Sequence, residues 1–188
     1  MDQSDKARKV FSYYWKHIRN YPRYVAGIAL ALPLTVLLNN YLPALILADV
    51  LSRLSQHDYQ EHQIWSSFGS SLILFLLILL AGMIMWRIID FFTWRLEGKI
   101  NKDIAEEVLS HMIDQSTDFH ANNFTGSLVS KTNKLLCGYI RTADTTIFQT
   151  YPLFAGIVIA AIILMPKSPL FTIILVIFSA FWFLFWLL

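Results

Sequence analysis

The chain has 188 residues, 56% of them hydrophobic, with a mean hydropathy of +0.50 and a formal net charge of +2. The length would suit one soluble domain, but the charge distribution excludes that class, and nothing indicates a nucleic-acid partner. None of the 15 basic and 13 acidic residues falls within residues 24–48, 62–86, 145–166 or 168–188. Because a membrane-spanning helix needs roughly 20 apolar residues, we predict an all-α membrane protein in contact with lipid, with four spans at about 24–50, 68–92, 149–165 and 169–188.

The basic residues predict the orientation of these spans. Six of the 15 precede residue 24, and seven lie between residues 87 and 141. Positively charged segments stay in the cytoplasm, so we expect a cytoplasmic N-terminus. The membrane is expected to be the plasma (inner) membrane. The single cysteine, Cys137, excludes an internal disulfide and a paired-cysteine metal site, and we expect no metal.

Residues 5–20 are predicted to form an interfacial helix. Val10, Phe11, Tyr14, Trp15 and Ile18 recur at the spacing of one helical face. Basic side chains flank that face, which suits the headgroup layer of a membrane. The alternative is a disordered basic leader.

The first span contains two prolines, Pro33 and Pro43, with Asn39 and Asn40 between them. Prolines kink a membrane helix and free backbone carbonyls. The two asparagines are candidates for a translocation path, since polar residues in membranes often face a wet cavity. Equally, they could stabilise the kink.

At the end of the second span, Arg87 and Asp90 lie three residues apart. This spacing puts both side chains on one helical face, so we predict an intrahelical pair near the cytoplasmic surface.

Residues 93–148 are predicted to form a long helical hairpin. Ile100, Ile104, Val108 and Met112 repeat every four residues, and a similar pattern from residue 136 to 147 follows. Between the two patterns lies the segment 118–126, whose Asn, Thr and Gly content predicts a reversal. An arm of about 24 residues would reach roughly 36 Å beyond the membrane.

This order of elements resembles the transmembrane domain of ATP-binding cassette (ABC) exporters, of the type-1 exporter fold, and matches its N-terminal part. The segment from Asp118 to Lys131 is similar to the family's aromatic pair, short polar stretch and Gly-x-apolar-x-Ser-Arg motif. His120 replaces the second aromatic residue, Ser127 a frequent Glu, and Lys131 the usual Arg. Leu135 replaces an acidic residue.

The resemblance implies a cytoplasmic elbow helix at residues 1–23 and a partial exporter transmembrane domain at residues 24–188. It also implies a coupling helix that docks on a nucleotide-binding domain, either in the same polypeptide or in a separate subunit. The matching positions are Asp118, Phe119, His120, Ala121, Asn122 and Asn123. A second exporter subunit, forming a homodimer or a heterodimer, would complete the substrate path.

ATP and Mg²⁺ would be bound by that nucleotide-binding domain. The only Gly-Lys pair in this chain, Gly98-Lys99, is followed by Ile100 and lacks the other residues of a phosphate-binding loop. We therefore expect no catalytic residue, no cofactor and no enzyme activity in this chain alone. Because the family has six spans and the last apolar run stops at Leu188, we expect a fragment.

The alternative function is a complete four-span accessory protein whose cytoplasmic hairpin docks a soluble partner. A polar tail after the fourth span would favour it, and the chain ends instead in Phe-Trp-Leu-Leu. A membrane enzyme is not supported by any motif.

Overall fold

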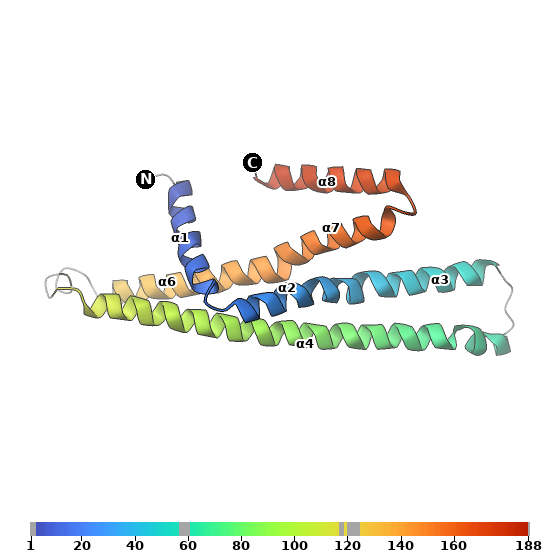
Figure 1. Cartoon of the computed structure of the whole chain (residues 1–188), viewed down its shortest axis with the longest axis horizontal. Coiled ribbons are helices and arrows are strands. Elements are labelled where there is room, and N and C mark those ends of the chain that lie inside the picture. Colours follow the sequence, from blue (N-terminus) through green and yellow to red (C-terminus); the bar gives the residue numbers. More distant parts are fainter. Residues whose placement is uncertain (1–2, 57–60, 117–118, 120–124, 188) are drawn as a thin grey trace. The chain divides into compact units, whose positions relative to one another are not determined.

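The computed structural model describes residues 3–56, 61–116, 119 and 125–187, and within these ranges the secondary structure is helical, without strands. An all-α fold was predicted, and it is confirmed. The elements in chain order (Figure 1) are α1 (Gln3–Ile18), α2 (Pro22–Val36), η1 (Leu37–Tyr41), α3 (Leu42–Gln56), α4 (Glu61–Ile113), α6 (Thr125–Asp144), η2 (Thr145–Thr150), α7 (Tyr151–Leu164) and α8 (Pro169–Leu187).

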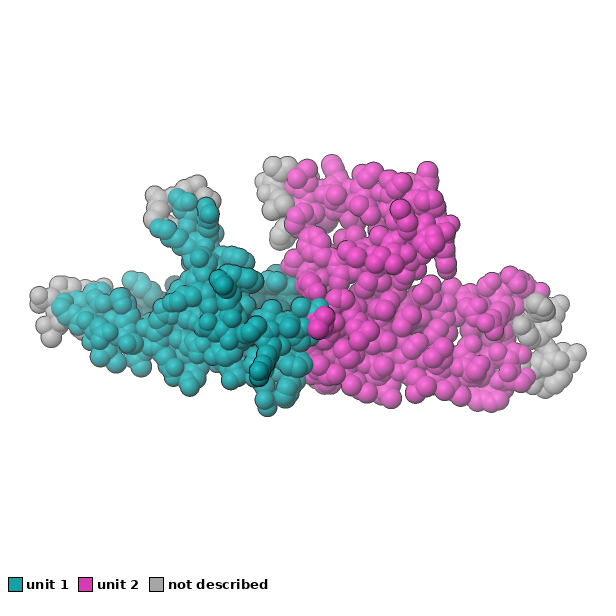
Figure 2. All heavy atoms as spheres, in the orientation of Figure 1, with its two compact units in different colours: residues 1–29, 90–149 teal, residues 30–89, 150–188 magenta. Residues whose placement is uncertain are grey.

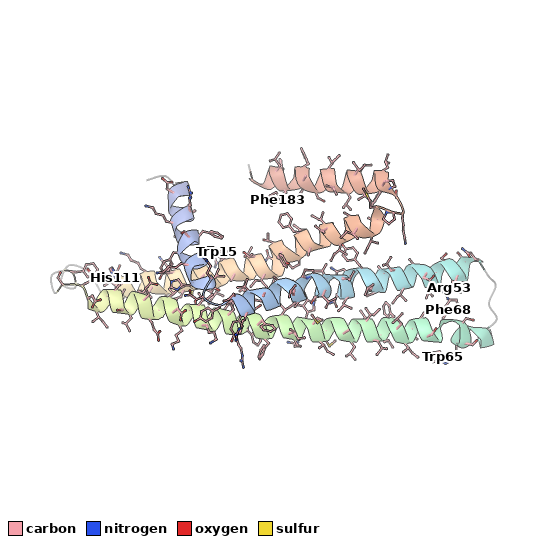
Figure 3. The ribbon with its side chains drawn as sticks, viewed as in Figure 1. Trp15, Arg53, Trp65, Phe68, His111 and Phe183 are labelled. Carbon is pink, nitrogen blue, oxygen red and sulfur yellow. The ribbon has the colours of Figure 1, made fainter. Side chains whose placement is uncertain are left out.

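Three helical segments are long and apolar enough to cross a membrane. They are Pro22–Gln56, Trp65–Ile113 and Gly126–Leu164. They contain the first two predicted spans and all but the last residue of the third. The fourth corresponds to a shorter apolar helix, Pro169–Phe185. Apolar side chains project from both α7 and α8 (Figure 3), and Phe178 and Phe181 are among the exposed ones. Such surfaces suit a hydrocarbon solvent.

The chain divides into two compact units (Figure 2). Unit 1 contains residues 1–29 and 90–149, and unit 2 contains residues 30–89 and 150–188. Helix α4 contributes its first part to unit 2 and its last part to unit 1.

The core of unit 1 lies along one face of α4. Thr93, Leu96, Ile100 and Ile104 are at most 4% exposed. The four-residue repeat that predicted a helix thus includes two fully buried residues, Ile100 and Ile104. Farther along the helix, at its last turns, Leu109 and Ile113 are exposed.

Helix α1 also belongs to unit 1 and begins and ends two residues earlier than predicted. Its predicted apolar face is divided. Tyr14 is buried, whereas Val10, Phe11 and Trp15 are exposed. Tyr14 packs on α6, where its ring meets that of Tyr139 edge-on at 5.5 Å between centroids.

In unit 2, the helical path widens next to a proline. Pro43 cannot donate a backbone hydrogen bond, and its ring crowds the carbonyl of the residue four positions earlier. The preceding turn, η1, is accordingly a π-helix, in which the Leu42 N–H reaches back to the Leu37 carbonyl. At the place where a kink was predicted, the first span therefore contains a π-helical turn, a rare conformation that is often found at functional sites.

Helices α7 and α8 pack together within unit 2 as a tight pair. The connection between them is the predicted turn, closed by the Ser168 N–H donating to the Leu164 carbonyl at 2.8 Å. The rings of Phe154 and Phe183 then meet edge-on, with centroids 5.3 Å apart.

Candidate functional site

The polar residues of η1 occupy different environments. Asn39 Nδ2 donates to the Thr35 carbonyl at 2.9 Å, and the Asn39 side chain lies against α4 at Gly82. A Cβ atom on Gly82 would be only 2.6 Å from Asn39 Oδ1. The Asn39 side chain is therefore engaged by Thr35 and packed on α4, whereas Asn40 is exposed.

A second polar contact of η1 holds α7. The Tyr41 hydroxyl donates to the Gly156 carbonyl at 2.7 Å. The phenol thus reaches a backbone carbonyl that already belongs to a helix, and a Cβ atom on Gly156 would lie 3.5 Å from its hydroxyl, an ordinary contact distance. The sequence offered only a weak signal for this contact, namely a glycine within an apolar span.

An apolar groove lies between α3 and α4 in unit 2. Its volume is about 260 Å³, and its lining includes Ile46, Leu47, Val50, Trp65 and Phe68. Ser71 contributes the only hydroxyl of the lining residues. The groove suits hydrocarbon better than a polar ligand.

Arg87 and Asp90 both lie in α4, Arg87 exposed and Asp90 half-buried. Their pairing on one helical face stays a prediction.

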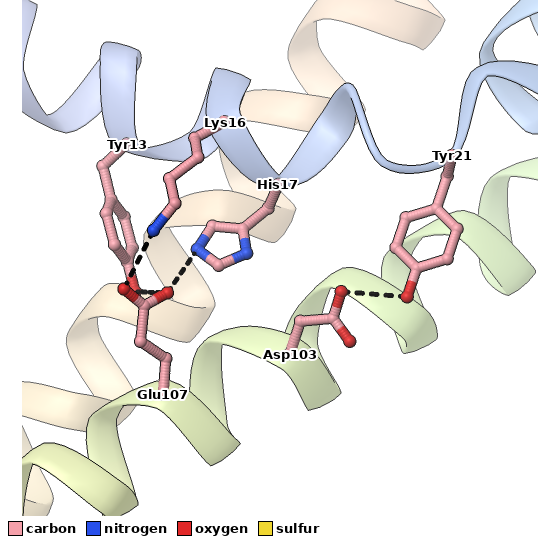
Figure 4. Close-up of polar contacts among 6 residues, drawn as sticks. All are labelled: Tyr13, Lys16, His17, Tyr21, Asp103 and Glu107. Atoms are coloured by element: carbon pink, nitrogen blue, oxygen red, sulfur yellow. Dashed lines mark hydrogen bonds and ion pairs between the residues drawn. The ribbon is translucent and has the colours of Figure 1, made fainter.

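In unit 1, a group of polar residues attaches α1 to α4 (Figure 4). Lys16 Nζ donates a hydrogen bond to Glu107 Oε1 at 3.2 Å, and His17 Nε2 lies 3.0 Å from Glu107 Oε2. Tyr13 adds a long hydrogen bond of 3.5 Å. These residues, which we name the Glu107 cluster, join the end of α1 to the half of α4 that follows the predicted span.

The charges of the Glu107 cluster shift two pKa values. Burial raises the pKa of Glu107. The hydrogen bond and charge of Lys16, and then the charge of His17, lower it by a larger amount, so the net pKa lies below the ordinary value. Burial, followed by the charge of Glu107, raises the pKa of Tyr13 to about 12. Glu107 is therefore anionic and Tyr13 neutral at neutral pH.

A second contact extends this attachment. The Tyr21 hydroxyl donates to Asp103 Oδ2 at 2.9 Å, one turn from Glu107 along α4 (Figure 4). The cation of Lys99 lies 5.6 Å from the centre of the Tyr21 ring. The residues between α1 and α2 are thus attached to the same helix.

The hairpin predicted from the sequence corresponds to the end of α4 and the start of α6. Helix α4 ends at Ile113 and α6 begins at Thr125, so residues 118–124 of the predicted reversal fall between them and its last two residues belong to α6. Phe119 is half-buried, and its N–H donates to Ser116 Oγ at 3.3 Å. The other predicted coupling residues, Asp118, His120, Ala121, Asn122 and Asn123, lie outside the described residues.

The Gly98-Lys99 pair lies within α4. Backbone N–H groups inside an α-helix are used in its own hydrogen bonds, whereas a phosphate cradle needs them free. The residues of this pair do not fit an ATP phosphate.

Comparison with known proteins identifies the family. The family model of the ABC transporter transmembrane region matches residues 27–187, which is most of the chain. Comparisons with curated proteins and with solved structures gave no match. The matched region contains the three long apolar helices from residue 27 onward, which include η1 and α7. It also contains α8. The chain belongs to the ABC transporter transmembrane family.

Proposed function

We propose that this chain is a transmembrane subunit of an ATP-driven exporter, which lines part of the substrate path and receives motion from a nucleotide-binding domain at residues 118–123. The observation that carries the proposal is the family match over residues 27–187, together with the helix pair α4 and α6. This pair reverses between Ile113 and Thr125, where the family resemblance puts the coupling helix.

Helix α4 is suited to carry such motion. It has 53 residues without a proline, so it contains no position at which a missing backbone hydrogen bond would bend it. A displacement at one end of an unbroken helix is transmitted along it as a rigid-body movement, as in other switching proteins.

The proposal includes an orientation and partners. The N-terminus and the hairpin face the cytoplasm of the plasma membrane, and α1 is the elbow helix, with its exposed Phe11 and Trp15 in the headgroup layer. A nucleotide-binding domain, in the same or another polypeptide, holds ATP and Mg²⁺. A second subunit, identical or different, completes the path. This chain contributes no catalytic residue to hydrolysis.

Asn40 is the better candidate of the two asparagines for the path. Asn39 is engaged by Thr35 and packed on Gly82, whereas Asn40 is exposed on a π-bulge. A polar side chain exposed within an apolar span is expected to face a wet cavity or another polar group.

The test measures the ATPase rate of the transporter, which can be done without knowing the exported substrate. The transporter containing this chain would be reconstituted in proteoliposomes, with Phe119→Ala as the variant, Phe119→Tyr as the conservative variant and Phe171→Ala on α8 as the control. Phe119→Ala is expected to lower the maximal ATPase rate at least about tenfold without changing the affinity for ATP, while both other variants keep it. A Phe119→Ala transporter with a normal ATPase rate would contradict the coupling role.

A further inference from the structure

Helix α1 packs one face on unit 1 and leaves another face exposed. Tyr14 and His17 are 6% and 5% exposed, and they hold the first face on α6 and α4. Phe11 and Trp15, by contrast, are 62% and 51% exposed. Because the contacts of the first face fix the rotation of the helix, the second face is available to a ligand.

Two arginines flank the exposed rings. Arg8 precedes Phe11 by three residues, and Arg19 follows Trp15 by four. Arg19 lies just after α1, but its N–H donates to the Trp15 carbonyl at 3.1 Å, so it continues the helical path. Spacings of three and four residues put the four side chains on one side of the helix, over about 16 Å of its length. We name Arg8, Phe11, Trp15 and Arg19 the outer face of α1.

The positive charge of the outer face is not compensated. Arg8 and Arg19 are exposed, and among the residues that the structure describes neither guanidinium has an ion-pair or hydrogen-bond partner. The neighbouring cation of Lys16, in contrast, is paired with Glu107. A guanidinium can donate two parallel hydrogen bonds to one phosphate or carboxylate group. The two arginines therefore favour an anionic partner.

The direction of α1 favours a membrane surface as that partner. Within unit 1, α1 runs across the long axis of α4 (Figure 1), and α4 is long and apolar enough to cross a membrane. A helix that lies across a span lies along the membrane surface, so the whole outer face meets the bilayer at a similar depth. A bilayer offers phosphate groups beside an apolar region along this length, which suits two arginines that flank two aromatic rings.

We propose that the outer face of α1 binds anionic phospholipid. The rings of Phe11 and Trp15 enter the boundary between headgroups and acyl chains, and the guanidiniums of Arg8 and Arg19 bind lipid phosphates. A lipid with a net negative headgroup is preferred, because a zwitterionic headgroup carries its own cation beside the phosphate. The inference rests on the placement of α1 in the headgroup layer under the proposed function, and it requires neither ATP nor a transported substrate.

The expected preference follows from the charges. One basic residue near an anionic membrane surface gives roughly a fivefold preference, so two arginines should give about 25-fold. Salt should reduce this preference, because exposed charges are screened. The rings contribute equally to the binding of anionic and zwitterionic lipids, since the acyl chains of the two are the same. The contributions of the arginines and of the rings can therefore be measured separately.

The experiment measures which lipid contacts the outer face. The full chain would be reconstituted in bilayers of phosphatidylcholine and phosphatidylglycerol, with a bimane fluorophore at Ser12→Cys in a Cys137→Ser background. Ser12 is an exposed residue of α1 next to Phe11. Bromine atoms on the acyl chains quench bimane only at short range, and they are carried by phosphatidylglycerol in one series and by phosphatidylcholine in the other. The ratio of the two quenching curves gives the preference for the anionic lipid at this site.

The labelled parent chain should prefer phosphatidylglycerol by about 25-fold at low salt and by less at high salt. Arg8→Gln and Arg19→Gln should each lower the preference about fivefold, and together they should remove it. The double change Arg8→Lys and Arg19→Lys keeps both charges and should keep most of the preference. Arg141→Gln removes the same charge from an exposed position of α6, and this control should behave like the parent.

The aromatic residues are tested in the same bilayers. Phe11→Ala combined with Trp15→Ala should weaken the quenching by both lipids, because the helix then enters the acyl boundary less deeply. The ratio of the two quenching curves should stay that of the parent, since both arginines are kept. Unchanged quenching by both lipids would contradict the insertion of the rings.

Two further results would overturn the lipid site. Equal quenching of the parent by the two lipids, or a full preference kept by the double glutamine variant, would show that the arginines do not select lipid. Strong quenching in either case would leave α1 in the headgroup layer, so this part of the proposed function would survive. A parent that neither lipid quenches would contradict both the lipid site and the headgroup placement, and would indicate that a protein surface covers the outer face.

Discussion

The Tyr14 hydroxyl donates a 2.9 Å hydrogen bond to the Leu135 carbonyl, 121 positions away in the sequence, and so joins α1 to α6. A Cβ atom on Gly138 would be 3.0 Å from the same hydroxyl. The phenol therefore lies so close to Gly138 that a side chain there would crowd its hydroxyl. With the Glu107 cluster, this contact attaches α1 to both arms of the hairpin.

Tyr14→Phe should lower stability by about 1 kcal/mol, the usual value of one hydrogen bond, because the ring packing on Tyr139 is kept. Tyr14→Ala should cost about 3 kcal/mol, since the buried ring is also lost. Unfolding in mixed detergent, followed by circular dichroism, measures both. Arg8→Ala, at an exposed position of α1, is the control and should change stability by less than about 0.5 kcal/mol. Equal stabilities of Tyr14→Ala and Arg8→Ala would show that α1 is not attached.

Glu107→Gln should lower the melting temperature at pH 7, because it weakens the contacts with Lys16 and His17. The pKa of Glu107 is lower in the folded chain than its ordinary value of 4.5. Its stabilising contribution is therefore present above pH 4.5 and is lost as pH falls through the lower, folded-state pKa. The melting difference between wild type and variant should shrink on acidification and in high salt. A difference that grows below pH 4.5 would contradict this assignment.

Gly82→Ala should destabilise unit 2 by about 1–3 kcal/mol, the usual cost of overpacking, because the new Cβ would collide with Asn39 Oδ1. Asn39→Ala should remove most of that cost when the two changes are combined, and a double-mutant cycle measures the coupling. Gly98→Ala is the matched control. It lies in the same helix with no atom within 4 Å of a Cβ, so it should stabilise the helix by up to about 1 kcal/mol. Additive effects of Gly82→Ala and Asn39→Ala would contradict the packing.

Cys137 tests the orientation. Its side chain is exposed on α6, so a membrane-impermeant maleimide should react with it in inverted membrane vesicles and not in intact cells. A Cys137→Ser protein controls for other targets of the reagent. Labelling of intact cells at the rate seen in inverted vesicles would reverse the proposed orientation.

The sequence predicted the helices well because their physical causes are local. Stretches without charge are long enough for a bilayer, and the spacing of Ile100 and Ile104 identifies a face that is buried in the structure. Proline chemistry likewise predicted a deformation between Pro33 and Pro43, seen as the π-helix η1. Each of these depends on residues within one continuous stretch of the sequence.

The contacts between distant segments could not be predicted in the same way. Periodicity shows which side chains share a face of α1, but not that Tyr14 is covered by α6 while Trp15 is exposed. Tyr13 and Glu107 are 94 positions apart and belong to no motif, so only the fold brings them together. Helix α8 shows a further limit, because an apolar composition alone does not establish a complete membrane span.

The most direct test of the proposed function is cross-linking from the hairpin reversal. A single cysteine at Phe119→Cys, in a Cys137→Ser background, would carry a photoreactive cross-linker in inverted membrane vesicles that contain the assembled transporter. Azido-ATP would label nucleotide-binding polypeptides, and Ser168→Cys, in the turn between α7 and α8, is the control position. We predict an ATP-labelled adduct from residue 119 and none from residue 168. No ATP-labelled adduct from residue 119, or equal adducts from both positions, would contradict coupling through this reversal.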